Sequence, residues 1–254
     1  MSNNNLFILN FHSVFPQNKE HRYHYDPVFS ISEEQFINYL NWIISQKINI
    51  TNWKNILTSN YSSTNQIAIS FDDGHLSDYE IVIPILQQLK IDACFFIIAE
   101  KIQNDQITKE RVQKISDLGY SIGSHGLTHK KLTSLNKKEQ LYELLESKKI
   151  IEDCIGKEIH FIAFPEGRFN RRLLKLCEKV GYSKTFSTFN KWNSTFSLSN
   201  NFGRWSIKQN TTFDKFEKTI LKYNFTVISN RFLSILKFYL LKTLDLINLK
   251  SKKA

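Results

Sequence analysis

The sequence has little proline and little glycine, with four and eight residues in a chain of 254. Disordered and linker-rich chains are usually enriched in these two residues, so the composition argues against both classes. Hydrophobic residues make up 41% of the chain and charged residues 23%, which is enough to bury one large core. We therefore expect a single globular domain that carries at most a short appendage.

Cysteine is also scarce. The three cysteines, Cys94, Cys154 and Cys177, are odd in number, have no C-x-x-C spacing and lie within apolar segments. Such a set indicates neither a disulfide framework nor a cysteine zinc site. We predict buried free thiols in a reducing compartment.

Long hydrophobic runs are missing as well. The first five residues carry no basic side chain, and Asn10 interrupts the apolar stretch that follows, so no secretory signal is indicated. Lys237 and Lys242 break the best candidate for a membrane-spanning segment, which needs roughly 20 apolar residues. The sequence therefore predicts a cytoplasmic protein, either free or bound peripherally at the inner face of the membrane.

Acidic residues are outnumbered by basic ones, 24 against 34, which gives a formal net charge of +10. This balance favours partners that carry phosphate or other anionic groups without choosing among them. Nucleic acid, an acidic glycan, a sugar phosphate and an anionic membrane all fit the charge alone.

What the chain does have is a regular alternation of apolar strands and amphipathic helices. The strand-like segments are 6–11, 67–71, 93–98, 120–123 and 159–164, and helical patterns begin near 32 and 136 and cover 77–89, 108–118, 170–180 and 213–221. This order implies right-handed βαβ units and a parallel sheet, either open or closed into a barrel. Functional loops of such folds gather at the carboxyl ends of the strands.

Two carboxylates follow one of these strands directly. Asp72 and Asp73 come after segment 67–71, and Gly74 then lets the backbone turn sharply. Successive strand residues point in opposite directions, so one carboxylate can bind a cation while the other faces a substrate. An isolated Asp-Asp-Gly is more often a turn and a helix N-cap.

Two histidines follow segment 120–123. His125 and His129 are four residues apart, and on a helical turn this spacing places both rings on one side. A lone pair is as often surface or helix capping, but together with Asp73 it predicts a divalent metal ion, Zn before Co, Ni or Fe. Three protein ligands describe a catalytic site, in which the ion lowers the pKa of bound water from about 15.7 towards 7. Asp72 is then free to act as the general base.

At these residues the sequence resembles the polysaccharide deacetylases, the NodB-homology group or carbohydrate esterase family four. The likeness runs from about Leu6 to Ile207 and is carried by Ser70-Phe71-Asp72-Asp73-Gly74 and Ser124-His125-Gly126-Leu127-Thr128-His129. It implies a distorted (β/α) barrel and a metal-dependent hydrolase that removes an N-acetyl group from an amino sugar. In the family the first Asp is the base, while the second Asp and both histidines bind the metal.

Phe164-Pro165-Glu166-Gly167 resembles the family's third motif, a strand and tight turn that line the substrate groove. The backbone N–H at the position of Glu166 helps to stabilise the oxyanion in family members, which often have an aromatic residue there. A backbone donor survives a change of side chain, so the resemblance implies that this role persists. A Pro-Gly turn without any direct catalytic part is the alternative.

The remaining parts of the family's site depart from its usual pattern. The Arg that orients the catalytic Asp is missing before the third motif, but Arg204 in Gly203-Arg204-Trp205-Ser206-Ile207 resembles a late Pro-Arg-Ile segment of another branch. We expect Arg204 to bind Asp72, with a surface charge as the alternative, and Trp205 to contact substrate.

The late histidine that protonates the leaving amine in the family is also missing, since no histidine follows His160. His12, at the end of the first predicted strand, resembles the N-terminal Tyr-His of exopolysaccharide deacetylases. We expect His12 to be the general acid, with a structural histidine or a substrate contact as the alternatives.

Residues 226–254 read as a basic amphipathic helix that follows a catalytic domain over residues 1–225. Asp245 is the only acidic residue in this segment, which carries several Lys and Arg residues. Its apolar residues recur every three or four positions. The apolar face either packs on the barrel or binds an anionic membrane, which would suit an enzyme acting on a lipid-linked sugar. No nucleic-acid recognition motif accompanies the charge, so we predict no nucleic-acid partner.

Two rival functions stay open at this point. A deformylase or another C–N amidase would use the same scaffold and release a different acid. A catalytically silent glycan-binding or membrane-assembly protein is suggested by the missing late histidine.

Overall fold

The computed structural model describes residues 5–16, 26–62, 64–103, 107–188, 193–194 and 200–222. The chain divides into two compact units, of which the larger is Asn4–Thr211. The other comprises Met1–Asn3 and Thr212–Ala254, and its described part contains a helix over 213–222, which confirms the helical pattern predicted at 213–221. The predicted helix over 226–254 lies outside the described residues.

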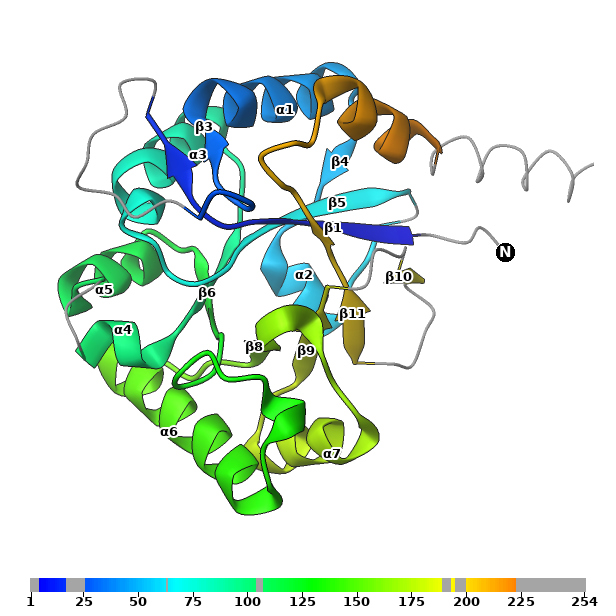
Figure 1. The fold of residues 1–254 in the computed structure, drawn as a ribbon. Helices are drawn as coiled ribbons and strands as arrows, with labels where there is room; N and C mark the ends of the chain where they lie inside the picture. The colour runs from blue at the N-terminus through cyan, green and yellow to red at the C-terminus, as the bar shows by residue number, and fades with distance from the viewer. Residues whose placement is uncertain are drawn as a thin grey trace, which may run out of the picture. The chain divides into compact units, whose positions relative to one another are not determined.

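Parallel strands form the centre of the larger unit (Figure 1). They run in the order β10-β1-β5-β6-β7-β8-β9-β11, and only β10 is antiparallel to its neighbour. The bounds are β1 (Asn5–Phe11), β5 (Gln66–Phe71), β6 (Cys94–Ile97), β7 (Ser121–Ser124), β8 (Phe161–Ala163), β9 (Lys184–Ser187), β10 (Asn193–Ser194) and β11 (Asn201–Gly203). β4 (Asn49–Ile50) pairs with β5, and β2 (Val14–Phe15) and β3 (Ile31–Ser32) form a separate pair.

A short segment closes this sheet on itself. β11 pairs with β9, and one residue later β12 (Trp205–Ser206) pairs with β1 in a parallel register. The residue between the two strands is Arg204, whose backbone N–H donates to the carbonyl of Ser187 at 2.9 Å. The last strand of the path, β11, is thus connected through β12 to β1, and the prediction of a distorted (β/α) barrel is confirmed.

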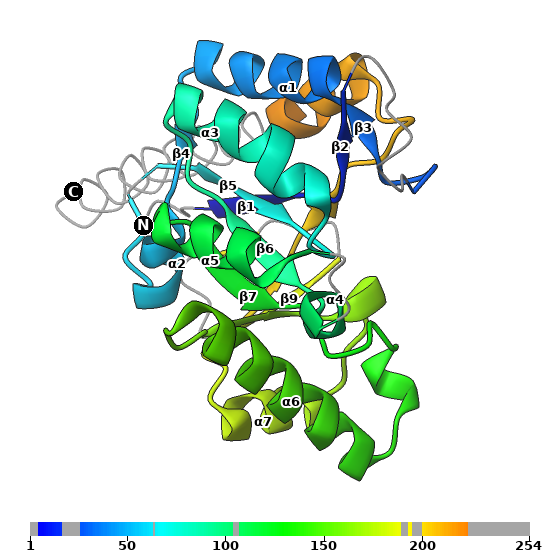
Figure 2. The same ribbon diagram turned by 90° about the vertical axis from the view of Figure 1, so that its left-hand side faces the viewer.

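Helices surround the strands, with α1 and α3 beyond one side and α6 and α7 beyond the other (Figures 1 and 2). Their bounds are α1 (Glu33–Ser45), α2 (Trp53–Thr58), α3 (Ile83–Leu89), α4 (Ala99–Gln103), α5 (Lys109–Asp117), α6 (Lys137–Ile155) and α7 (Arg171–Val180). A π-helix, η1 (Asp78–Val82), precedes α3, and two short 3-10 helices are η2 (Leu132–Ser134) and η3 (Pro165–Gly167).

Local capping signals in the sequence set several helix ends. The Ser32 side chain accepts from the amide of Gln35 at the start of α1, and Asn136 forms a capping box with Glu139 at the start of α6. The pattern over 77–89 is not one regular helix, because it opens as the π-helix η1. Pro84 has no N–H to donate to the preceding turn, which fits a change of helix type there.

The core lies inside the barrel and between the strands and helices. All six residues of β5 are buried, as expected of a parallel strand that is covered on both faces. Trp53 is fully buried in a cluster with Leu6, Phe96, Phe161 and Phe186, and its indole N–H donates to the carbonyl of Ile69 at 2.8 Å.

The three cysteines are buried and free, as predicted. Among the described residues, no helix is both long enough and apolar enough to span a bilayer.

Candidate active site and metal centre

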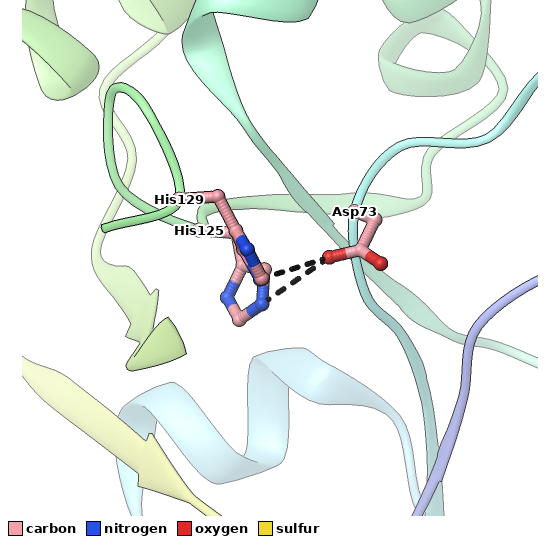
Figure 3. A group of neighbouring side chains, drawn as sticks. All are labelled: Asp73, His125 and His129. Atoms are coloured by element: carbon pink, nitrogen blue, oxygen red, sulfur yellow. Dashed lines mark ion pairs between the residues drawn. The ribbon is translucent and has the colours of Figure 1, made fainter. Parts of the chain in front are cut away.

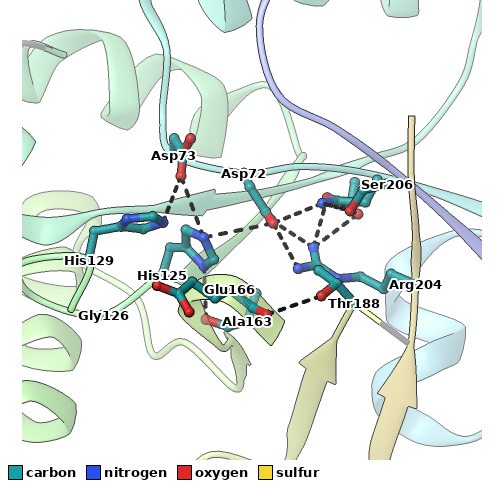
Figure 4. Close-up of polar contacts among 12 residues, drawn as sticks. Asp72, Asp73, His125, Gly126, His129, Ala163, Glu166, Thr188, Arg204 and Ser206 are labelled. Carbon is teal, nitrogen blue, oxygen red and sulfur yellow. Dashed lines mark hydrogen bonds and ion pairs between the residues drawn. The ribbon is translucent and has the colours of Figure 1, made fainter. Parts of the chain in front are cut away.

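The site begins where β5 ends. The amide of Asp72 still donates to the carbonyl of Phe11 in β1, at 2.9 Å, and so continues the sheet by one residue. The backbone then turns through the left-handed conformation at Asp73 (φ 77°) and Gly74 (φ 66°). Asp tolerates this conformation better than most residues, and Gly adopts it without strain. As the alternation along a strand predicts, the two carboxylates point to different partners (Figure 4).

Asp72 is bound by a guanidinium fork. The Nη1 of Arg204 lies 2.7 Å from Oδ1 of Asp72, and its Nη2 lies 2.8 Å from Oδ2. Both side chains are buried, so Arg204 is the partner of Asp72 and not a surface charge. Burial alone would raise the pKa of Asp72, but the charge and hydrogen bonds of Arg204, together with the nearby His125, outweigh it and hold the pKa below its usual value. Asp72 is therefore an ionised carboxylate at neutral pH.

Asn10 binds both members of this pair, a role that was not predicted from the sequence. Its Nδ2 donates to Oδ2 of Asp72 at 2.9 Å, and its Oδ1 accepts from Nη1 of Arg204 at 2.9 Å and from the Ser70 hydroxyl at 3.0 Å. The signal was present as a polar residue that interrupts an apolar strand. In a strand covered on both faces, such a residue must find buried partners.

Asp73 faces the two histidines. Its Oδ1 lies 3.5 Å from Nε2 of His125 and 3.4 Å from Nε2 of His129 (Figure 3). One ligand atom from each residue lies within 4.8 Å of the other two. Within the described part of the chain, the buried Oδ1 has no hydrogen-bond partner, so it stands free to bind a cation. The donor set of two imidazoles and one carboxylate fits Zn²⁺, Co²⁺, Ni²⁺ or Fe²⁺.

The orientation of the His125 ring also suits a metal ligand. Its Nδ1 lies 2.9 Å from the carbonyl oxygen of Ala163, which accepts only from a protonated nitrogen. Nδ1 therefore carries a proton, which leaves Nε2, the ring nitrogen that faces Asp73, as the atom that can bind a metal. Histidines that bind metals usually donate their other ring N–H in this way.

The two histidines lie in a loop and not on a helical turn. Residues 125–130 form a loop, in which Gly126 (φ 80°) and His129 (φ 61°) adopt the left-handed conformation. The tight loop brings the two ring centroids to 4.9 Å. Backbone reversal at these two residues brings the rings together without a helical turn.

The third motif forms the turn η3 beside this cluster. Phe164 and Pro165 are buried, whereas Glu166 is exposed and its Oε2 lies 3.5 Å from Nζ of Lys131. Gly167 (φ 67°) is required here, since a Cβ at this position would lie 1.9 Å from the hydroxyl oxygen of Thr188. That hydroxyl donates to the carbonyl of Glu166 at 3.3 Å. The turn is thus fixed close to His125 (Figure 4), while the oxyanion role of the Glu166 amide stays a prediction.

His12 follows β1, on the same edge of the sheet as Asp72. Its ring stacks on Phe29 with 4.5 Å between the centroids, and its buried Nδ1 has no hydrogen-bond partner among the described residues. Burial lowers the pKa of His12, and the negative charges of Asp72 and Asp73 offset part of this shift. The two carboxylates are thus near enough for their charges to influence the pKa of the His12 ring. The role of His12 as the general acid stays a prediction.

Trp205 is the residue after Arg204 and the first residue of β12. It is 8% exposed, and its ring is 5.8 Å from the ring of Phe7. The contact with Phe7 favours a packing role, and the substrate contact of Trp205 stays a prediction.

The known proteins that this chain resembles are polysaccharide deacetylases. The family model described as polysaccharide deacetylase matches residues 59–185, which are 127 of the 254 residues. A peptidoglycan-N-acetylglucosamine deacetylase of Bacillus cereus is 30% identical over 117 residues, 46% of this chain and 53% of that protein. A poly-beta-1,6-N-acetyl-D-glucosamine N-deacetylase of Staphylococcus aureus is 27% identical over 199 residues, 71% of this chain and 67% of that protein.

The fold is shared with solved structures. The deacetylase PplD of Streptococcus pyogenes, in complex with acetate, superposes with a TM-score of 0.74 at 18% identity, covering 85% of this chain and 97% of that one. At this identity the likeness concerns the fold alone. This chain spans about half the length of the first curated relatives that it matches.

Proposed function

The chain belongs to the polysaccharide deacetylase family, and on this premise we propose that it is a metal-dependent hydrolase that removes an N-acetyl group from an amino sugar. One observation carries the proposal: Asp73, His125 and His129 converge beside the buried pair of Asp72 and Arg204. Two relatives named for N-acetylglucosamine polymers support an N-acetylated glycan, or a precursor of one, as the substrate.

Asp73, His125 and His129 would hold the divalent cation, with Zn²⁺ as the first choice for this donor set. When bound, such a cation lowers the pKa of a water molecule towards 7 and polarises the acetyl carbonyl. Burial would raise the pKa of Asp73, but the ring of His75, whose Nε2 lies 3.5 Å from Oδ2 of Asp73, and the other nearby histidines hold that pKa well below its usual value. Asp73 is thus already ionised, as a metal ligand has to be.

Asp72 is the proposed general base. Its Oδ2 lies 3.8 Å from Nε2 of His125, which places it next to the ligand cluster. Asp72 takes a proton from the water that attacks the acetyl carbon. Arg204 and Asn10 act as positioning residues, because they hold the carboxylate in one orientation and keep it ionised.

His12 is the proposed general acid. When the C–N bond breaks, the amine nitrogen of the sugar needs a proton, and His12 supplies it while acetate leaves with the oxygen of the water. The backbone N–H of Glu166 is proposed to donate to the oxygen of the acetyl carbonyl, where negative charge develops. Phe164, Pro165 and Gly167 hold that turn in place.

Acetate release is the direct test of this function. The full chain should be incubated with N-acetylglucosamine oligomers and peptidoglycan, with Zn²⁺ or Co²⁺ added, and both acetate and free amine should be measured. We expect both products, their loss on chelation and their return with metal. Formate from N-formyl sugars in place of acetate would favour the deformylase. No turnover on any substrate together with no metal uptake would contradict the proposal.

The pH dependence of kcat tests His12. Its pKa lies below the ordinary 6.5 because of burial, and a general acid has to be protonated, so kcat should fall as the pH rises through that pKa. A nearby bound cation would lower the pKa further, so the direction is the same in the metal-loaded enzyme. We expect His12→Gln to lower kcat by about 100-fold and to remove this alkaline limb. An unchanged pH profile in His12→Gln would exclude His12 as the acid.

Location and lipid contact are further proposals. We propose a cytoplasmic enzyme that is held peripherally at the inner membrane face by residues 226–254, with a lipid-linked sugar as one fitting substrate. The support is the basic, amphipathic pattern of that segment and the formal charge of +10. Equal binding of the full chain to anionic and neutral lipid vesicles would contradict the membrane contact.

A further inference from the structure

The loop between the two histidines has an unusual set of backbone partners. Residues 126–128 belong to neither a helix nor a strand, so their amides and carbonyls need partners elsewhere. The carbonyls of Gly126 and Leu127 accept from the amides of Ala99 and Glu100, at 3.1 and 3.0 Å. These two donors are at the start of α4. One side of the loop is therefore fixed by a helix N-terminus.

A single side chain fixes the other side. Oε2 of Glu143, in α6, accepts from the amides of Leu127 and Thr128 at 2.9 and 3.1 Å, and Oε1 accepts from the hydroxyl of Thr128. Glu143 is 4% exposed. Among the described residues, no ion pair with Lys or Arg accompanies these bonds. A carboxylate only accepts hydrogen bonds, so three donors from two adjacent loop residues match what it needs.

The consequence concerns the histidines that flank this loop. His125 is oriented by its own ring, through the carbonyl of Ala163. The side chain of His129 is 41% exposed, and its backbone is in the left-handed conformation, so its direction depends on the loop that leads to it. The contacts of Glu143 end at Thr128, the residue directly before His129.

We propose that Glu143 is a positioning residue of the metal centre: it holds the loop so that Nε2 of His129 meets Asp73 and His125. This inference rests on the proposed function, because it assumes that these three residues bind a metal. A carboxylate is buried here at a cost, and the loop amides would be left without an acceptor if it were removed. Partners outside the ligand set that fix ligand geometry typically change metal affinity by about 10-fold to 100-fold when they are replaced.

The experiment compares metal affinity with stability in the full chain. Glu143→Gln keeps the size of the side chain but loses the charge and one acceptor oxygen, and Thr128→Val removes only the hydroxyl donor. Glu146→Gln is the matched control, since it makes the same change three residues along α6, where the side chain is only partly buried. The Kd for Zn²⁺ is measured by competition with a chromophoric chelator, the visible spectrum is recorded with Co²⁺, and Tm is measured without metal.

We expect Glu143→Gln to weaken Zn²⁺ binding by about 10-fold to 100-fold and to alter the Co²⁺ spectrum. Thr128→Val should show a smaller change in the same direction, and Glu146→Gln none. Wild-type affinity in folded Glu143→Gln, even with a lower Tm, would overturn the inference and leave Glu143 a structural role. If Glu143→Gln does not fold, wild-type affinity in Thr128→Val overturns it. No metal uptake by the wild type would instead overturn the proposed function itself.

Discussion

Replacing Asp72 with Asn is expected to lower kcat by about 100-fold to 10,000-fold, the range that general base catalysis usually contributes. Asn has almost the same shape but cannot take a proton from water. The ligand atoms of Asp73, His125 and His129 belong to other side chains, so metal binding should persist. The measurement is kcat for acetate release per metal-loaded enzyme, together with the Kd for Zn²⁺.

The control for this change is Asp153→Asn. Asp153 is exposed on α6, so the same substitution there should leave kcat unaltered. Asp72→Asn also leaves the buried Arg204 without its anionic partner, so the folded fraction has to be measured for each variant. A folded, metal-loaded Asp72→Asn that keeps kcat within a few-fold of the wild type would exclude Asp72 as the base. Intact biological activity in the same variant would favour the catalytically silent rival.

Much of the site could be predicted because its signals are local. A buried strand that ends in Asp72-Asp73-Gly74 places two carboxylates at the carboxyl edge of a parallel sheet, whatever the rest of the chain does. The position of His125 follows in the same way from β7. Helix starts at Ser32 and Asn136 could be predicted because capping side chains act within three residues.

The closing strands could not be predicted by the same means. β9, β11 and β12 are two to four residues long, and the sequence of β9 is Lys-Thr-Phe-Ser, which has no apolar run. Their pairing depends on segments far away in the chain, since β12 pairs with β1. Periodicity carries no information about such contacts. The resemblance suggested Arg204, but only the closure of the barrel explains how it reaches Asp72.

Asn10 and Glu143 were missed for a related reason. Asn10 bonds to a residue 62 positions away, and Glu143 bonds to one 16 positions away. In the sequence, Glu143 is one of several polar residues in an amphipathic helix, and its neighbours Leu141, Leu144 and Leu145 define the apolar pattern. A polar residue within that stripe is a useful signal, but it does not reveal the partner.

Replacing Arg204 with Leu is expected to lower the free energy of unfolding by about 3–5 kcal/mol, as when one partner of a buried ion pair is removed. Arg204 is fully buried, and without it Asp72 would keep a buried charge that, among the described residues, only Asn10 hydrogen-bonds. Its pKa should then rise, because burial would no longer be opposed by the guanidinium. Arg204→Lys should recover part of the stability, since an ammonium restores the charge but not the two parallel hydrogen bonds. Chemical denaturation of the metal-free protein measures both effects.

A double-mutant cycle separates the ion pair from the other contacts of Arg204. Its guanidinium also lies over the ring of Phe96 at 4.9 Å and donates to Oδ1 of Asn10, and these contacts are lost in any background. If the pair with Asp72 dominates, Arg204→Leu should cost less in Asp72→Asn than in the wild type, with a coupling of about 0.5–3 kcal/mol. The same cost in both backgrounds would contradict this, and the stability would then come from Phe96 and Asn10. In that case Arg204 would still orient Asp72 for catalysis, but the ion pair would not contribute to the free energy of unfolding.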